Sequence, residues 1–189
     1  PYDERIKYLT AVGKWANKIG KSFKIAGVMK YIPPDHFLQR FVFANTVPNQ
    51  ETLKYLQGAY LTINMSRDIN WHPWLPTNPD VYTVKPYSAN PRMYEAAICK
   101  CLQIVQDDRK GYRDFLGGGG LYFDTEQSLI YTLNLAFGYE KPKFNGESRR
   151  YMTNIAHQKV LRSGCYQHRI LKLFDHMKRI DIMSPYEPV

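Results

Sequence analysis

Residues 71–87 read WHPWLPTNPDVYTVKPY and interrupt a chain whose hydrophobic spacing is otherwise mostly helical. Proline fixes φ, lacks a backbone donor and pushes the residue before it towards extended conformations, so its recurrence here excludes a helix interior or a central strand. The sequence therefore predicts an extended strap over residues 71–91. The strap carries Trp71, Trp74, Tyr82 and Tyr87 without a surplus of charge, and we expect it to lie against a partner surface.

Helical spacing precedes the strap. Asp3 is a suitable N-cap for a helix that runs through Trp15 towards Gly27. Lysines such as Lys14 and Lys18 fall mostly on the face opposite its apolar stripe. Such a helix fits a groove of a larger partner, an anionic membrane surface or the core of its own domain. Shorter helices are expected to begin at Asp35 and at Pro48, the second with Leu53, Leu56, Tyr60 and Ile63 on one side.

Helical spacing also follows the strap. Asn90-Pro91 is a suitable N-cap with a first-turn proline, and the helix it starts should end by Gly117. A capping box at Asp124–Gln127 and a C-cap at Gly138 predict another helix, and further helical spacing runs from Tyr151 to Met177. A strand pattern is present only at residues 121–123. The predicted fold class is mostly α, with several amphipathic helices joined by long irregular, proline-rich connections.

We expect two regions, a helical region 1–116 that includes the strap and a helical C-terminal extension 117–189. The net charge of +9 favours acidic partners, which include nucleic acid, anionic lipid and acidic protein faces. Three cysteines are an odd and sparse set, which argues against a disulfide framework and favours a reducing compartment. The apolar run 129–137 is too short and interrupted to span a bilayer. The chain begins at Pro1 instead of Met, which suits a processed or trimmed chain.

The sequence contains no strong catalytic motif. Gly117–Gly120 lacks the lysine of a phosphate-binding loop and is better explained as a helix terminus. Cys99, Cys101 and Cys165 with His168 lack the usual spacing of a zinc site. The acidic clusters at 107–108 and 124–126 are explained by helix surface and capping. We therefore predict no catalytic, cofactor-binding or metal-binding residue, and a protein that is not an enzyme.

One family is similar to the first half of the chain. Ala26-Gly27 followed by Lys30, then Leu75-Pro76, then residues 80–87 occur in the order found in the cytochrome b-c1 complex subunit 7 family. In the last of these motifs Asp80, Val81, Pro86 and Tyr87 match, whereas Tyr82 stands where that family usually has proline. The resemblance covers about residues 1–115. Residues from Gly117 onwards would then be a long C-terminal extension of a divergent member.

The resemblance implies a non-catalytic accessory subunit of mitochondrial complex III, ubiquinol-cytochrome c reductase. It implies a peripheral location on the matrix side of the inner membrane, contacts with cytochrome b and the core subunits, and a role in assembly and stability. Anionic lipid is a further expected contact. The residues predicted to bind partners are Trp15, Lys14, Lys18, Trp71, Trp74, Asp80, Tyr82, Pro86 and Tyr87.

Two alternatives stay open at this point. A basic face in the C-terminal half, with interleaved aromatic residues, also fits a mitochondrial ribosomal protein that binds ribosomal RNA. This face includes Lys159, Arg162, Lys172 and Phe174. The third interpretation is a small basic enzyme that uses the loop Gly117–Gly120.

Overall fold

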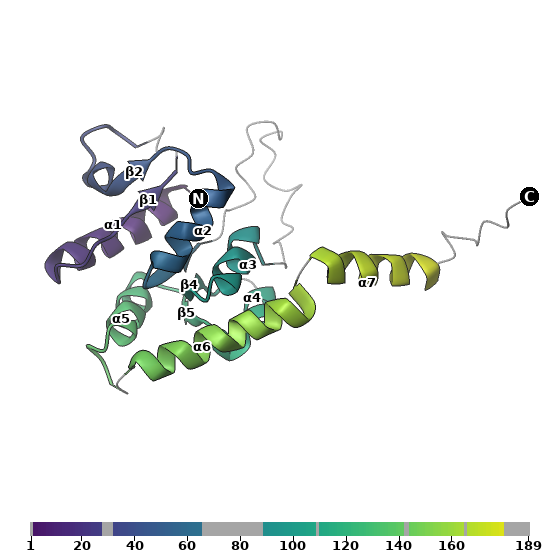
Figure 1. Cartoon of the computed structure of the whole chain (residues 1–189). Helices are drawn as coiled ribbons and strands as arrows, with labels where there is room; N and C mark the ends of the chain where they lie inside the picture. Colours follow the sequence, from purple (N-terminus) through teal and green to yellow (C-terminus); the bar gives the residue numbers. More distant parts are fainter. Residues whose placement is uncertain are drawn as a thin grey trace, which may run out of the picture.

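The computed structural model describes residues 2–27, 32–65, 89–108, 110–141, 144–164 and 166–179, and helices alternate with short strands along it (Figure 1). The N-terminal elements are α1 (Tyr2–Lys18), β1 (Ile25–Ala26), η1 (Phe37–Phe41), β2 (Val42–Ala44) and α2 (Asn49–Gly58). The central elements are β3 (Leu61–Asn64), α3 (Pro91–Ile98), β4 (Leu102–Gln106), α4 (Lys110–Leu116), η2 (Gly117–Gly119) and β5 (Leu121–Phe123). The C-terminal elements are α5 (Glu126–Ala136), α6 (Gly146–Lys159), η3 (Val160–Gly164) and α7 (Tyr166–Arg179).

A three-stranded parallel sheet with the order β3-β4-β5 forms the centre of the fold. Leu61 pairs with Leu102, and Ile104 pairs with Leu121, in parallel register. α3 precedes β4 and α4 precedes β5, so the chain returns to the start of the sheet through helices, as parallel strands require. A second parallel pair forms between β1 and β2.

The middle strand β4 is buried on both faces. Leu102 and Ile104 belong to a cluster with residues of α1 and α5, whereas Val105 belongs to a cluster with residues of α3, α4 and α6. Successive side chains of a strand point to opposite faces, so these two clusters are the two sides of the sheet. Helices therefore cover both sides, which gives an α/β architecture of three layers.

The last helices differ in how they pack. α6 lies along α3, α4 and η2, whereas α7 continues from η3 away from the packed layers (Figure 1). Ile170, Leu173 and Phe174 of α7 are about half exposed. The layered part of the chain therefore ends with α6 and η3.

The prediction of a mostly α fold with long, proline-rich connections is wrong, because the core is built on parallel strands. The helices expected from Pro48 and from Asn90 both end early. The first stops at Gly58, before β3, and the second stops at Ile98, before β4. The N-terminal helix likewise ends at Lys18 and not near Gly27.

Several local predictions are confirmed. Asn90 caps α3 by accepting from the backbone N–H of Met93, and Pro91 occupies its first position. A capping box does start α5, but it uses Thr125 and Ser128, one residue later than the predicted Asp124 and Gln127. A helical turn begins at Phe37, and the strand pattern at 121–123 is β5. The division at residue 116 stays a prediction, and β4 and β5 pair across it.

Candidate functional site

The carboxyl ends of β3, β4 and β5 meet at one edge of the sheet, because the three strands are parallel. Asn64, Gln106 and Phe123 are their last residues. In open sheets of this kind, ligands bind outside this edge, where loops and helix N-termini converge. The candidate site therefore comprises residues that follow these strands and residues that contact them.

Asp107 and Arg113 form an ion pair just beyond β4. Nε of Arg113 donates to both carboxylate oxygens of Asp107 at 2.9 Å, and Nη2 donates to Oδ2. The backbone N–H of Asp107 donates to the carbonyl oxygen of Phe123 at 2.7 Å. The guanidinium is largely exposed, so the pair contributes only about 0.5 kcal/mol to stability. The ion pair joins the loop after β4 to α4, and the backbone bond joins the same loop to β5.

The aromatic ring of Tyr122 packs against the guanidinium of this ion pair. The guanidinium carbon of Arg113 lies 4.6 Å from the centroid of the Tyr122 ring, a cation–π distance. The Tyr122 hydroxyl donates to the carbonyl oxygen of Gly117 at 2.9 Å. Burial raises the pKa of Tyr122 to about 12, so this hydroxyl keeps its proton at neutral pH.

Two side chains of α1 reach the same edge. Nη2 of Arg5 donates to the carbonyl oxygen of Met65, just after β3, at 3.2 Å. The Tyr8 hydroxyl donates to the carbonyl oxygen of Asp124, just after β5, at 3.1 Å. These bonds fix the start of α1 across the ends of two strands. They also bring a guanidinium to the edge from a segment far away in the sequence.

The first half of α3 adds a second pair of charges. Nη1 of Arg92 donates to Oε2 of Glu95 at 2.6 Å, and both side chains are partly exposed. Ala89, just before the helix, belongs to the same hydrophobic cluster as Val105 near the end of β4. Ala97 near the end of α3 belongs to this cluster as well, so α3 as a whole packs on the side of the sheet that Val105 faces. A ligand that extends from the carboxyl edge over the first half of α3 would meet one guanidinium and one carboxylate there.

A buried amide pair connects the sheet to α3. Nδ2 of Asn64 donates to Oε1 of Gln103 at 2.7 Å, and Nε2 of Gln103 donates to the carbonyl oxygen of Met93 at 3.0 Å. Gln103 is fully buried and Asn64 nearly so. Buried amides are stable only with such partners, so these two bonds specify where the first turn of α3 sits relative to β3 and β4.

We call the charged set at this edge the carboxyl-edge site. Its members come from α1, from the first half of α3, from α4 and from the segments just after β4 and β5. The set consists of Arg5, Arg92, Glu95, Asp107, Arg113 and Asp124.

Cys101 lies on the other side of α3, at the amino end of β4, and its thiol is buried. Burial raises the pKa of Cys101 to about 11, and burial also raises the pKa of Cys99. Neither thiol is therefore a ready nucleophile at neutral pH. Across the described ranges no group of three histidine, cysteine or acidic side chains is arranged to hold a metal ion. Cys165, the third residue of the zinc alternative, lies outside these ranges.

We expect the Cys101 thiol to make the stability of the folded chain decrease at alkaline pH. The pKa of Cys101 is higher in the folded chain than its ordinary value near 9, so its stabilising effect is present below pH 9 and is lost as pH rises towards 11. The free energy of unfolding should fall by about 2 kcal/mol over this interval. Urea unfolding at pH 8, 9, 10 and 11 measures it. Cys101→Ala should flatten the decline, whereas an equal slope in that variant would contradict the prediction.

The predicted partner-binding residues are distributed as follows. Trp15 is buried in α1, where its Nε1 donates to Oδ1 of Asn134 at 2.7 Å and its ring packs on Phe137. Lys14 and Lys18 are exposed on the same helix. Trp71, Trp74, Asp80, Tyr82, Pro86 and Tyr87 lie outside the described residues. The role of this set in partner binding stays a prediction, and so do the mitochondrial location and the anionic lipid contact.

Sequence reasoning missed most of the carboxyl-edge site. It noted the acidic residues Asp107 and Asp124 but interpreted them as helix surface and capping, and it did not consider Arg5, Arg92 or Arg113. The positions of Asp107 and Asp124 directly after β4 and β5 become informative only once these segments are known to be parallel strands. None of the helices in the described part of the chain is long and apolar enough to cross a membrane.

A protein-family model described as glycosyl transferase-like matches residues 7–175, and this range contains every strand of both sheets. No curated protein and no solved structure matches the chain.

This match overturns the resemblance to complex III subunit 7 and the accessory respiratory function inferred from it. The ribosomal RNA alternative has no support, and the prediction that the protein is not an enzyme is wrong, since the matching family is one of glycosyl transfer. The motifs behind the resemblance are short and lie largely in residues 71–87, whereas the match extends over nearly the whole chain. The chain belongs to the glycosyl transferase-like family.

Proposed function

We propose that the chain is an enzyme that binds a sugar nucleotide at the carboxyl-edge site and transfers its glycosyl group to an acceptor. The observation that carries this proposal is the family match over residues 7–175, which includes the parallel sheet and the loops at its carboxyl edge. The three-layer α/β arrangement supports it, because such sheets bind nucleotides at that edge.

The charges at the edge suit the chemistry of such a donor. Glycosyl transfer breaks the bond between the anomeric carbon and the leaving oxygen, and the electron pair stays on the leaving nucleotide. Guanidinium groups stabilise that negative charge, and Arg5 and Arg92 supply them from two elements. A new bond forms between the anomeric carbon and the acceptor, whose proton passes to a base. Carboxylates such as Glu95 can accept hydrogen bonds from sugar hydroxyls.

We expect Glu95→Gln and Arg92→Gln each to weaken nucleotide binding by about tenfold. The first variant removes a charged acceptor for the sugar hydroxyls, and the second removes a charged donor to the phosphates. Isothermal titration calorimetry with UDP, GDP and ADP measures the affinity and identifies the base that the site prefers. The two residues pair at a partly exposed position, so the melting temperature should change little.

The matched control is Glu147→Gln, which removes an exposed carboxylate from α6, away from the carboxyl edge. This variant should bind like the unmodified chain. The proposal fails if none of the three nucleoside diphosphates binds, or if the Glu147 and Glu95 variants lose affinity equally.

A further inference from the structure

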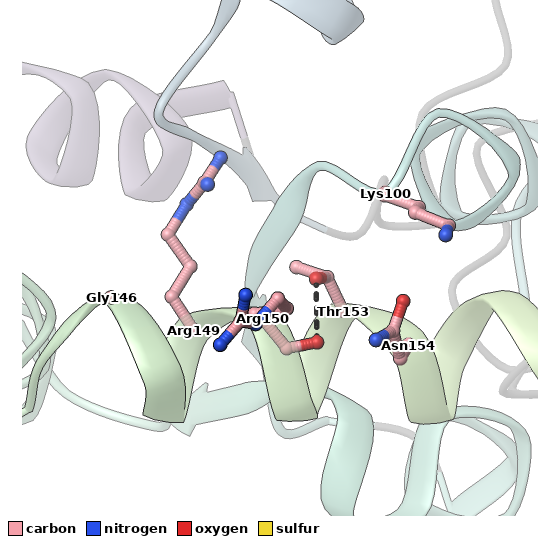
Figure 2. A pocket seen from close by; sticks show the side chains of 6 residues that line it. All are labelled: Lys100, Gly146, Arg149, Arg150, Thr153 and Asn154. Atoms are coloured by element: carbon pink, nitrogen blue, oxygen red, sulfur yellow. Dashed lines mark hydrogen bonds between the residues drawn. The ribbon is translucent and has the colours of Figure 1, made fainter.

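A basic hollow lies between the end of α3 and the first half of α6 (Figure 2). Its volume is about 590 Å³, and it includes three cationic side chains, two neutral polar ones and no carboxylate. Since Lys100 comes just before β4, the hollow lies at the amino end of this strand, away from the carboxyl-edge site. Its lining residues are Lys100, Gly146, Arg149, Arg150, Thr153 and Asn154.

One face of α6 forms most of the hollow. Residues 146, 149, 150, 153 and 154 recur at intervals of three and four, so they share a side of the helix. Nε of Arg149 donates to the carbonyl oxygen of Tyr60 at 3.1 Å, and its guanidinium lies 4.9 Å from the Tyr60 ring centroid. This contact holds Arg149 in place at one end. Figure 2 shows Lys100 across from Asn154 at the other end.

The backbone at Lys100 is unusual. Its φ is 53°, and within the described residues it is the non-glycine residue with a positive φ. The N–H of Lys100 donates to the carbonyl oxygen of Ala97, and the N–H of Cys101 donates to that of Ala96. This is the helix-ending geometry in which glycine is the usual residue, because a side chain is strained there. The left-handed backbone of Lys100 therefore costs free energy that glycine would not, and the Lys100 side chain lines the hollow.

The cations of the hollow lack internal compensation. Among the described residues, the side chains of Lys100 and Arg150 make no ion pair or hydrogen bond. Like charges that share a concave surface repel each other, and an anion between them removes that repulsion. A phosphate group combines the charge with acceptor oxygens that guanidinium, ammonium and amide donors can contact. The Thr153 hydroxyl donates to the carbonyl oxygen of Arg150 at 3.2 Å, so it lines the hollow without serving as a donor to the phosphate (Figure 2).

We infer that the basic hollow binds a phosphate group, carried either by a soluble phosphoester or by the headgroup of an anionic lipid. This site is separate from the carboxyl-edge site and does not depend on the proposed glycosyl transfer. The strained lysine is the feature that distinguishes it from an ordinary basic surface.

Titration with inorganic phosphate, followed by amide chemical shifts at constant ionic strength, tests the soluble source. Sedimentation with phosphatidylcholine vesicles that contain phosphatidylglycerol tests the lipid source. Lys100→Gly should weaken whichever binding is observed by about tenfold and should also raise the melting temperature, because glycine relieves the strain. Arg150→Gln should weaken binding to a similar extent. Arg162→Gln, an exposed arginine outside the hollow, is the matched control and should bind normally.

Saturable shifts at the hollow, or vesicle binding, that the Lys100 and Arg150 variants lose and the Arg162 variant keeps would support the inference. Absence of both kinds of binding would overturn it. Equal losses in all three variants would also overturn it, because they would show that net charge alone attracts the anion. Loss of phosphate binding with intact nucleotide affinity would separate this site from the carboxyl-edge site.

Discussion

Replacing Gly119 by alanine is expected to lower the free energy of unfolding by about 3 kcal/mol. A Cβ at this position would lie 2.6 Å from the backbone nitrogen of Ala156 and 2.8 Å from its Cβ. Both atoms belong to α6 and cannot rotate away as the end of a long side chain can. The substitution therefore forces α6 away from η2, in a region where Ala156 and Val160 are almost fully buried.

Gly118→Ala is the matched control for this prediction. A Cβ at Gly118 would meet only the end of the Ile155 side chain at 3.8 Å, an ordinary contact. We expect its effect to stay within about 0.5 kcal/mol. Urea unfolding followed by circular dichroism compares the two variants. Equal stabilities would show that α6 does not depend on the missing side chain at Gly119.

This glycine run shows how a correct local interpretation can miss the reason for a residue. Sequence reasoning assigned Gly117–Gly120 to a helix terminus, and the structure places Gly117 there with a φ of 54°. The need for a glycine at 119 arises instead from the approach of α6, which lies almost 40 residues later along the chain. Contacts between distant segments leave no periodic signal in the sequence.

Local signals predicted the starts of helices well and their ends poorly. Asn90 and Pro91 identify the start of α3 because capping depends on neighbouring residues. Its end was missed because Lys100 takes the position where glycine usually gives the signal. Without that signal, Leu102 and Val105 seemed to continue the apolar spacing of the helix.

β4 could not have been recognised from alternation of polar and apolar residues. All five of its residues are buried, since helices cover both sides of the sheet. A short, continuously buried strand cannot be distinguished from part of a buried helix by periodicity. The carboxyl-edge site was missed for the same reason, because Asp107 indicates a ligand site only after β4 is known to be a parallel strand.

The side chain of Gln103 connects β3 and β4 to the first turn of α3 through hydrogen bonds to Asn64 and Met93. Gln103→Leu is expected to lower the free energy of unfolding by about 3 kcal/mol. Leucine has a similar size but cannot bond the Asn64 amide or the Met93 carbonyl, so two buried polar groups lose their partner. Met93 lies in the first turn of α3, next to Arg92. Nucleotide affinity should therefore fall along with stability, and calorimetry on the folded variant measures that second effect.

The double variant Asn64→Leu with Gln103→Leu separates loss of packing from loss of the hydrogen bond between the two side-chain amides. Asn64→Leu alone leaves the Gln103 carbonyl without its donor, whereas the double variant leaves neither amide in the core. We expect the double variant to be at least about 1 kcal/mol more stable than the sum of the single effects predicts. Strictly additive losses would mean that the two amides act independently. In that case the position of α3 would have to depend on the apolar contacts of Met93 and Ala97.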